Sequence, residues 1–261
     1  MVFFFVLFAL CGGQLVLGQD NQAQQAGSFS VILCADGTVQ TAGANVFGQL
    51  GNGTNTASTT FVNVIDLANV VSISEGYGHG LAVKADGTVW AWGSNDLGQL
   101  GIGSSSLIPA QVTLSGSAVS ISASYLSSYV ILSDCTVWAW GDNSDGQLGI
   151  GISASVGDTT QVVGVSNALQ LSAGENFLLL LLPNGAIWAS GNNTNCQFGI
   201  SGSSTNVPVF AFSLPNIISL HSGWYHTIAM LQNGSIQVWG KNTFGQLGLG
   251  STNSPVCRAN Y

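Results

Sequence analysis

Basic residues are almost absent from this chain, whose 261 residues include only Lys84, Lys241 and Arg258 against eleven acidic residues. Charged residues make up 5% of the sequence, whereas an average domain has about 25%. The formal net charge is −8. Nucleic-acid binding draws most of its affinity from several contacts between basic side chains and phosphates. Three basic residues cannot supply them, so the composition argues against nucleic acid and against an anionic membrane surface as a partner.

Residues that usually carry catalysis or bind metals are also scarce. The chain has three histidines and no C-x-x-C spacing, so we expect no zinc site. It has no serine in a nucleophile elbow and no His-Glu-x-x-His motif. Glu75 and Glu175 lie two positions apart in aligned repeats, and we interpret both as solvated loop acids. The sequence therefore predicts no catalytic residue, no metal, no cofactor and no enzymatic activity.

Only the N-terminus has a long hydrophobic run, "MVFFFVLFAL". This run is too short for a membrane span of about 20 residues, and Val16 and Gly18 suit a signal-peptidase site. We predict a signal peptide over 1–18, a polar linker over 19–26 and secretion of a chain that begins at Gln19. The run lacks a preceding Lys or Arg, so a retained anchor and an artefact of the gene model remain alternatives.

The cysteines and the glycosylation sequons fit an exported protein. Removal of Cys11 with the signal peptide leaves four cysteines, which allow three pairings: Cys34, Cys135, Cys196 and Cys257. Three sequons lie in expected turns and make their asparagines candidate glycosylation sites: Asn52, Asn192 and Asn233.

A glycine-rich motif of nine residues occurs five times, at intervals of 48 to 50 residues. The copies cover 43–51, 93–101, 141–149, 191–199 and 240–248. Each opens on a glycine (Gly43, Gly93, Gly141, Gly191 and Gly240) and has an asparagine two residues later (Asn45, Asn95, Asn143, Asn193 and Asn242). Such a period indicates a repeat architecture, so these ten residues are predicted to be structural.

The segments between the motifs read as short β-strands. Asp-Gly or Asn-Gly turns separate apolar runs such as "GLAVK" and "TVWAWG", which is a strong hairpin signal. Two more apolar runs complete each unit, and no segment has a helical period. Four strands in about 50 residues, repeated, are typical of a β-propeller blade. We predict an all-β propeller over 27–261 with about five four-stranded repeats.

The unit "SEGYGHGLAVKADGTVWAWGSNDLGQLGIG", residues 74–103, resembles the repeat of the regulator of chromosome condensation family. The resemblance spans roughly 27–250 and implies a seven-bladed propeller. Seven blades need twenty-eight strands, whereas this chain shows nineteen. One explanation, which we favour, is an open arc or a fragment of a longer propeller. The other is a smaller closed ring in which "PVCRANY" pairs beside the first hairpin and brings Cys34 near Cys257.

Aromatic residues at the starts of the hairpin strands are the candidate binding residues. Tyr77, Tyr125, Trp224 and Tyr225 lie opposite the Asp-Gly turns, and we align Trp224 with Tyr77, Tyr125 and Asn176. Tyrosine and tryptophan with few charges suit a protein-contact surface. We therefore predict a secreted, non-catalytic module that binds an unidentified protein, similar in fold to a secreted β-lactamase inhibitor protein. The alternative implied by the resemblance is nucleotide exchange or another action on a GTPase.

Other residues of the repeat have structural interpretations. His79 and His226 share one repeat position with Phe29, Ser127 and Phe177, which predicts packing. "GWYHT" at 223–227 is similar to a motif of the plant UV-B photoreceptor of this family, but its tryptophan has no tryptophan neighbours. The remaining tryptophans are predicted to pack between blades. Cys196 replaces a motif glycine where we expect a positive φ, and the sequence offers no benefit for that cost.

Overall fold

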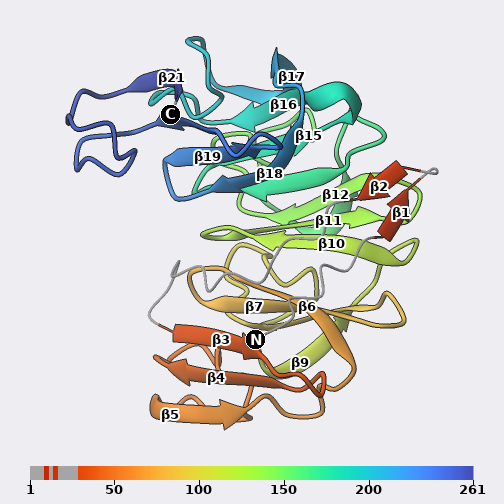
Figure 1. The fold of residues 1–261 in the computed structure, drawn as a ribbon. Helices are drawn as coiled ribbons and strands as arrows, with labels where there is room; N and C mark the ends of the chain where they lie inside the picture. Colours follow the sequence, from red (N-terminus) through yellow and green to blue (C-terminus); the bar gives the residue numbers. More distant parts are fainter. Residues whose placement is uncertain (1–8, 12–13, 17–28, 261) are drawn as a thin grey trace.

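The computed structural model describes residues 9–11, 14–16 and 29–260, and their regular structure is almost entirely β-strand (Figure 1). From Phe29 to Asn260 it has nineteen strands, β3 to β21, the number predicted from the repeats. Two further strands, β1 (Ala9–Cys11) and β2 (Gln14–Val16), pair with each other. The expected cleavage site after Gly18 and the linker 19–26 lie outside the described residues. In the described part of the chain, no helix is long and apolar enough to cross a membrane.

The nineteen strands form five antiparallel sheets, which we call blades 1 to 5 in chain order. Blade 1 has three strands, β3 (Phe29–Leu33), β4 (Val39–Gly43) and β5 (Ser58–Asn63). Blade 2 has four, β6 (Val70–Glu75), β7 (His79–Lys84), β8 (Val89–Gly93) and β9 (Ser106–Val112), and so has blade 3, β10 (Ala118–Ala123), β11 (Ser127–Leu132), β12 (Val137–Gly141) and β13 (Val156–Gln161). Blade 4 consists of β14 (Gln170–Ala173), β15 (Phe177–Leu181), β16 (Ala186–Gly191) and β17 (Thr205–Ser213), and blade 5 of β18 (Ile217–Ser222), β19 (His226–Leu231), β20 (Ile236–Gly240) and β21 (Val256–Asn260).

The blades are arranged as an open arc, with blade 1 and blade 5 at opposite ends of the view (Figure 1). The first strand of each four-stranded blade is the inner one, because β6, β10, β14 and β18 contact each other in turn. Blade 1 lacks an inner strand among the described residues. Within residues 29–260 the ring is not closed by hydrogen bonds, as the open-arc prediction requires. The closed alternative is wrong, since β21 pairs with β20 in its own blade rather than beside β3.

The second strands of blades 2 to 4 are buried on both faces because each of these blades lies between two others. All five residues of β15, "FLLLL", are buried, which explains why this strand shows no alternation of apolar and polar residues. In blades 1 to 3 the turns between second and third strands are built by aspartate. Asp86 Oδ1 accepts hydrogen bonds from the Thr88 backbone N–H at 3.0 Å and from its hydroxyl at 2.7 Å. These bonds lower the pKa of Asp86 below its usual value, and they close the turn locally.

The repeat asparagine organises the long loop between the third and fourth strands. In blade 3, Asn143 is fully buried, and its Oδ1 accepts the Leu148 N–H at 2.9 Å. Its Nδ2 donates to the Ile152 and Ala154 carbonyls. The glycine that opens each motif is also required, because Gly93 has a φ of 103° and a Cβ there would lie 2.3 Å from the Gly78 carbonyl oxygen. One buried amide thus pairs three backbone groups of the loop that would otherwise lack partners.

A buried tryptophan joins each of three blades to the motif loop of the preceding blade. Trp92, Trp140 and Trp239 are fully buried. Their indole N–H groups donate to the carbonyls of motif glutamines, which are Gln49 at 2.9 Å, Gln99 at 2.9 Å and Gln197 at 2.8 Å. In blade 4 the equivalent residue is Ser190, whose hydroxyl donates to the Gln147 carbonyl. The prediction that these tryptophans pack between blades is confirmed.

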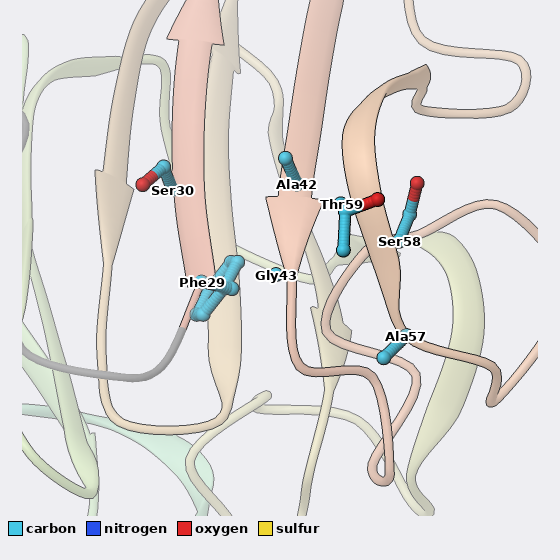
Figure 2. Close-up of a pocket in the computed structure, with 7 residues that line it drawn as sticks. All are labelled: Phe29, Ser30, Ala42, Gly43, Ala57, Ser58 and Thr59. Atoms are coloured by element: carbon cyan, nitrogen blue, oxygen red, sulfur yellow. The ribbon is translucent and has the colours of Figure 1, made fainter.

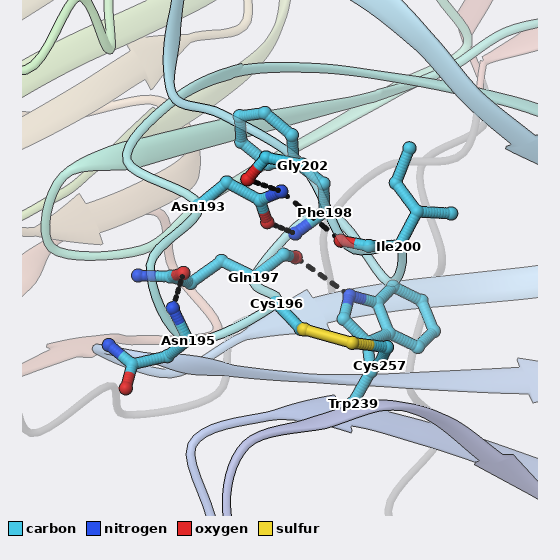
Figure 3. The surroundings of a disulfide bond; sticks show 9 residues. All are labelled: Asn193, Asn195, Cys196, Gln197, Phe198, Ile200, Gly202, Trp239 and Cys257. Atoms are coloured by element: carbon cyan, nitrogen blue, oxygen red, sulfur yellow. Dashed lines mark hydrogen bonds between the residues drawn. A yellow bond between two sulfur atoms is a disulfide. The ribbon is translucent and has the colours of Figure 1, made fainter.

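A disulfide joins Cys196 to Cys257, with 4.9 Å between their Cα atoms (Figure 3). The pairing of Cys34 with Cys257 that the closed-ring alternative would allow is therefore wrong, and Cys34 has a free thiol. The reason is the arc itself, because Cys34 lies in blade 1 and Cys257 on the outer strand of blade 5. Cys196 has a φ of 56°, as expected for the glycine that it replaces. The benefit that the sequence did not show is a covalent link between the motif loop of blade 4 and blade 5.

We predict that Cys257→Ser lowers the free energy of unfolding by about 2 kcal/mol, because the disulfide closes a segment of 61 residues and restricts the unfolded chain. Urea denaturation under non-reducing conditions measures the effect. Cys34→Ser is the matched control, since its thiol is free, and it should leave the midpoint unchanged. An unchanged midpoint in Cys257→Ser as well would contradict a stabilising disulfide.

Candidate functional site

The blades present two kinds of connection at opposite ends of their strands. The turns between first and second strands lie beside the motif loops, because β7 begins at His79 opposite Gly93, where β8 ends. A backbone hydrogen bond of 2.8 Å from Ser94 N–H to the Gly78 carbonyl joins turn and loop. We call this end the loop face. The Asp-Gly turns lie at the other end, so the candidate binding residues and the motif loops share one face, as the sequence predicted.

The strand register aligns the first turns of blades 2 to 5 residue by residue. His79, Ser127, Phe177 and His226 each pair with the glycine that ends the third strand. Two residues earlier, the equivalent positions are Tyr77, Tyr125, Glu175 and Trp224, which we call the axial ring.

The sequence alignment of the fourth blade was therefore wrong by one residue. Asn176 is equivalent to Tyr225, because their carbonyls accept the N–H groups of Asn192 and Lys241, the residues that follow the motif glycine. Glu175 was interpreted as a solvated loop acid, yet it takes the place of an aromatic residue. Four equivalent turn positions thus consist of three aromatic rings and one carboxylate.

The aromatic members of the axial ring contact each other. The ring centroids of Tyr77 and Tyr125 are 4.7 Å apart, and Tyr125 meets Trp224 edge-on at 6.2 Å. Tyr77 is 40% and Trp224 46% exposed. The backbone fixes their spacing, because Tyr77 N–H donates to the Tyr125 carbonyl at 3.0 Å and Glu175 N–H donates to the Trp224 carbonyl at 2.9 Å. The structure therefore brings three of the four predicted binding residues together on a backbone that is already ordered.

Tyr225, the fourth predicted residue, lies beside the ring and contacts its acid. Its hydroxyl donates to the Glu175 carboxylate, and this bond is the main cause that raises the pKa of Tyr225 to about 12. The Lys241 ammonium lies 4.8 Å from the centre of the Tyr225 ring. Glu175 also contributes to raising the pKa of Tyr125, after burial and Tyr77. The carboxylate of Glu175 is therefore placed among phenols rather than in open solvent.

Of the two repeat histidines, His79 is packed against blade 3 and His226 is half-buried. His79 is completely buried, and its Nε2 lies 3.0 Å from the Ser128 hydroxyl oxygen. That hydroxyl donates to the Gln99 carbonyl at 2.7 Å, so His79 Nε2–H must be the donor of the pair. Burial lowers the pKa of His79 to about 3. Burial also lowers the pKa of His226. Both residues thus have the packing role expected of them.

Glu75 differs from the solvated loop acid that the sequence predicted. It ends the inner strand β6 and is buried, whereas alanine or serine ends the other inner strands. The Val31 backbone N–H donates to its carboxylate, but burial has the larger effect and raises the pKa of Glu75 to about 8. Its Oε1 has no hydrogen-bond partner. Glu75 lies where blade 1 lacks an inner strand, and its carboxylate meets the free edge of β3.

A hollow lies on blade 1, apart from the axial ring, with a volume of about 520 Å³ (Figure 2). Residues at the loop-face ends of β3 to β5 line it: Phe29, Ser30, Ala42, Gly43, Ala57, Ser58 and Thr59. None of these seven has a group that titrates near neutral pH, so the hollow offers no acid or base. Among the described residues, no group of three His, Cys, Asp or Glu side chains is placed to hold a metal ion.

The three candidate glycosylation residues lie in turns and loops, as expected. Asn233 is exposed, whereas Asn52 and Asn192 are half-buried. In each sequon the asparagine Oδ1 accepts hydrogen bonds from the Thr or Ser two residues later. Their occupancy stays a prediction.

Comparison with protein families finds the regulator of chromosome condensation (RCC1) repeat. One model of this repeat matches 86–131, 134–181 and 184–230, which together cover more than half of the chain. A second model of the same repeat matches 70–99, 118–147 and 217–246. No curated protein matches the sequence.

Solved structures with the same fold include human WBSCR16 and the yeast protein Prp20p. WBSCR16 is 20% identical with a TM-score of 0.78, and covers 89% of this chain and 64% of its own. Prp20p from Saccharomyces cerevisiae is 22% identical with a TM-score of 0.79, and the match covers 89% of this chain and 61% of Prp20p. Yeast RCC1 (Prp20) bound to Kap60 is 22% identical with a TM-score of 0.77, and the match covers 87% of this chain and 57% of the yeast protein. The chain thus spans less than two thirds of the length of these structures.

Proposed function

The chain belongs to the regulator of chromosome condensation repeat family, and from that premise we propose that its propeller arc binds a protein through the loop face. The observation that carries the proposal is the axial ring with its exposed Tyr77 and Trp224. Large aromatic side chains on a backbone that does not need to be ordered are the usual anchors of protein interfaces. Prp20p, which shares the fold, has binding properties toward Gsp1p and histones, so a propeller of this kind can serve recognition.

We propose further that the module is not catalytic and that it acts outside the cell. The non-catalytic role is supported by the burial of His79 and Glu75, because these two groups lie beneath the surface rather than in an open cleft. The secreted role is supported by the apolar run at the N-terminus and by the Cys196–Cys257 disulfide, since disulfides persist in oxidising compartments. N-terminal sequencing of the protein recovered from the medium tests secretion, with Gln19 as the expected first residue.

Trp224→Ala is predicted to weaken capture of the partner by at least tenfold, because it removes the indole, which is the most exposed aromatic group of the axial ring. The measurement is quantitative mass spectrometry of the proteins that immobilised full-length chain retains, followed by titration of the retained protein. The matched control is Phe61→Ala on β5, whose side chain is 47% exposed on an outer strand. It should bind as the wild type does.

Equal capture by Trp224→Ala and by wild type would refute the loop face as the binding surface. If the captured protein is a GTPase, an assay of nucleotide release distinguishes exchange activity from simple binding. Accelerated release would favour the intracellular role of the family over the secreted one.

A further inference from the structure

The composition of the axial ring points to the chemistry of its ligand. Tyr77, Tyr125 and Trp224 present π-systems, and the faces of aromatic rings attract cations. Glu175 occupies the fourth equivalent position and supplies a full negative charge. Aromatic faces beside a carboxylate form the kind of site that binds an organic cation, and a neutral apolar ligand would leave the carboxylate uncompensated.

The carboxylate of Glu175 is only partly satisfied inside the protein. Tyr225 donates one hydrogen bond to it. The other oxygen, Oε2, is shielded from solvent and has no hydrogen-bond partner. A shielded acceptor without a partner is costly, and a cation that approaches the neighbouring rings would compensate the carboxylate through its charge. This feature favours a cation over a neutral ligand.

The chain has no basic residue left to fill this position. Each of its three basic side chains lies over another aromatic ring: Lys84 is 4.2 Å from the centre of Trp90, Lys241 is 4.8 Å from that of Tyr225, and Arg258 is 4.5 Å from that of Phe212. No basic side chain lies over Tyr77, Tyr125 or Trp224, the aromatic members of the axial ring. A formal net charge of −8 also attracts a basic partner over a longer range.

We propose that the axial ring binds a lysine or arginine side chain that a partner protein inserts between Glu175 and the aromatic rings. This inference rests on the proposed function, because it specifies which chemistry of the partner the loop face recognises. The cationic group stacks on Trp224 and Tyr125, and its charge faces the Glu175 carboxylate. Neighbouring first turns hold the site at fixed spacing through their backbone hydrogen bonds.

Two short peptides test the proposal on the full chain. The first is the acetylated amide Gly-Ser-Arg-Ser-Gly, and the second has citrulline in place of arginine, which keeps the shape and removes the charge. Binding is followed by tryptophan fluorescence, with Trp224→Phe identifying the signal of Trp224. We expect saturable binding of the arginine peptide in the millimolar range, at least tenfold weaker binding of the citrulline peptide, and weakening of the arginine peptide with increasing salt.

Glu175→Gln provides the second arm, because it keeps an acceptor for Tyr225 and removes the charge. It should weaken the arginine peptide by at least tenfold. Asp158→Asn on β13 changes net charge equally at an exposed position outside the ring, and it should bind as wild type does. Thermal melting verifies that each variant is folded. If Glu175→Gln does not fold, the comparison of arginine with citrulline on the wild-type chain still decides.

The outcomes separate the two levels of inference. Equal binding of both peptides, or of the arginine peptide to Glu175→Gln and wild type, overturns cation recognition. If Trp224→Ala then still loses the captured protein, the loop face remains the binding surface and only the chemistry of its ligand is wrong. If Trp224→Ala retains the captured protein, the proposed function itself fails.

Discussion

Trp140→Ala is expected to lower the free energy of unfolding by about 5 kcal/mol, which is the largest effect of any single change considered for this fold. Trp140 is fully buried in the cluster between blades 2 and 3, and truncation of a buried tryptophan costs about 3–5 kcal/mol. The substitution also removes the indole donor to the Gln99 carbonyl at 2.9 Å. Urea denaturation monitored by circular dichroism measures the change.

The neighbouring Trp138 is the matched control, because it lies two residues away on the same strand β12. It is only half-buried, and its indole N–H donates to the Thr136 hydroxyl in its own turn at 3.0 Å. Its truncation should cost about 1–2 kcal/mol, because little of the indole leaves the core. If Trp138→Ala lowered the free energy of unfolding as much as Trp140→Ala does, the contact of Trp140 with the preceding blade would not account for the larger effect.

Glu75→Gln is expected to make the protein more stable at pH 8 and to remove a loss of stability that the wild type suffers between pH 5 and pH 8. The pKa of Glu75 is raised from 4.5 to about 8 by burial. Above pH 4.5 the unfolded chain releases this proton, while the folded protein keeps it until about pH 8. The unfolded state is therefore stabilised relative to the folded state as the pH rises through this window. The free energy of unfolding of the wild type should fall by roughly 4 kcal/mol across it.

The test is the difference in unfolding free energy between Glu75→Gln and wild type at pH 5 and at pH 8. His79 has a lowered pKa, so it destabilises the folded protein as the pH falls below 6.5. This contribution is present in both proteins and cancels in the difference. Parallel pH profiles for the two proteins between pH 5 and pH 8 would mean that Glu75 is solvated, as the sequence first suggested.

Local signals with a fixed period made most of the fold predictable. The Asp-Gly turns and the apolar runs beside them act within a few residues, so all nineteen strands of the arc could be counted before their arrangement was known. The tryptophans of "WAWG" could be assigned to packing between blades for the same reason, since each copy of the motif places one against its neighbour. The three-stranded blade 1 also follows from the polar residues that precede Phe29.

The parts that the sequence did not reveal depend on contacts between blades. Cys257 pairs with Cys196 because the motif loop of blade 4 packs on blade 5, and nothing in the spacing of four cysteines indicates this. Glu175 was left out of the binding site by an alignment error of one residue, which the shared repeat position of His79 and Phe177 already corrects and the pairing of Phe177 with Gly191 confirms. Glu75 reads as a loop acid in the repeat, and its burial depends on β3 of the neighbouring blade.

The hydrogen bonds between neighbouring first turns have a consequence for how such a protein diversifies. They join main-chain atoms only, from Tyr77 to Tyr125 and from Glu175 to Trp224, so these backbone positions do not depend on which side chains stand there. The side chains themselves meet across blades, because Tyr125 contacts both Tyr77 and Trp224. A change of side chain at Tyr125 therefore alters the contacts of two other blades while the backbone of the site stays the same.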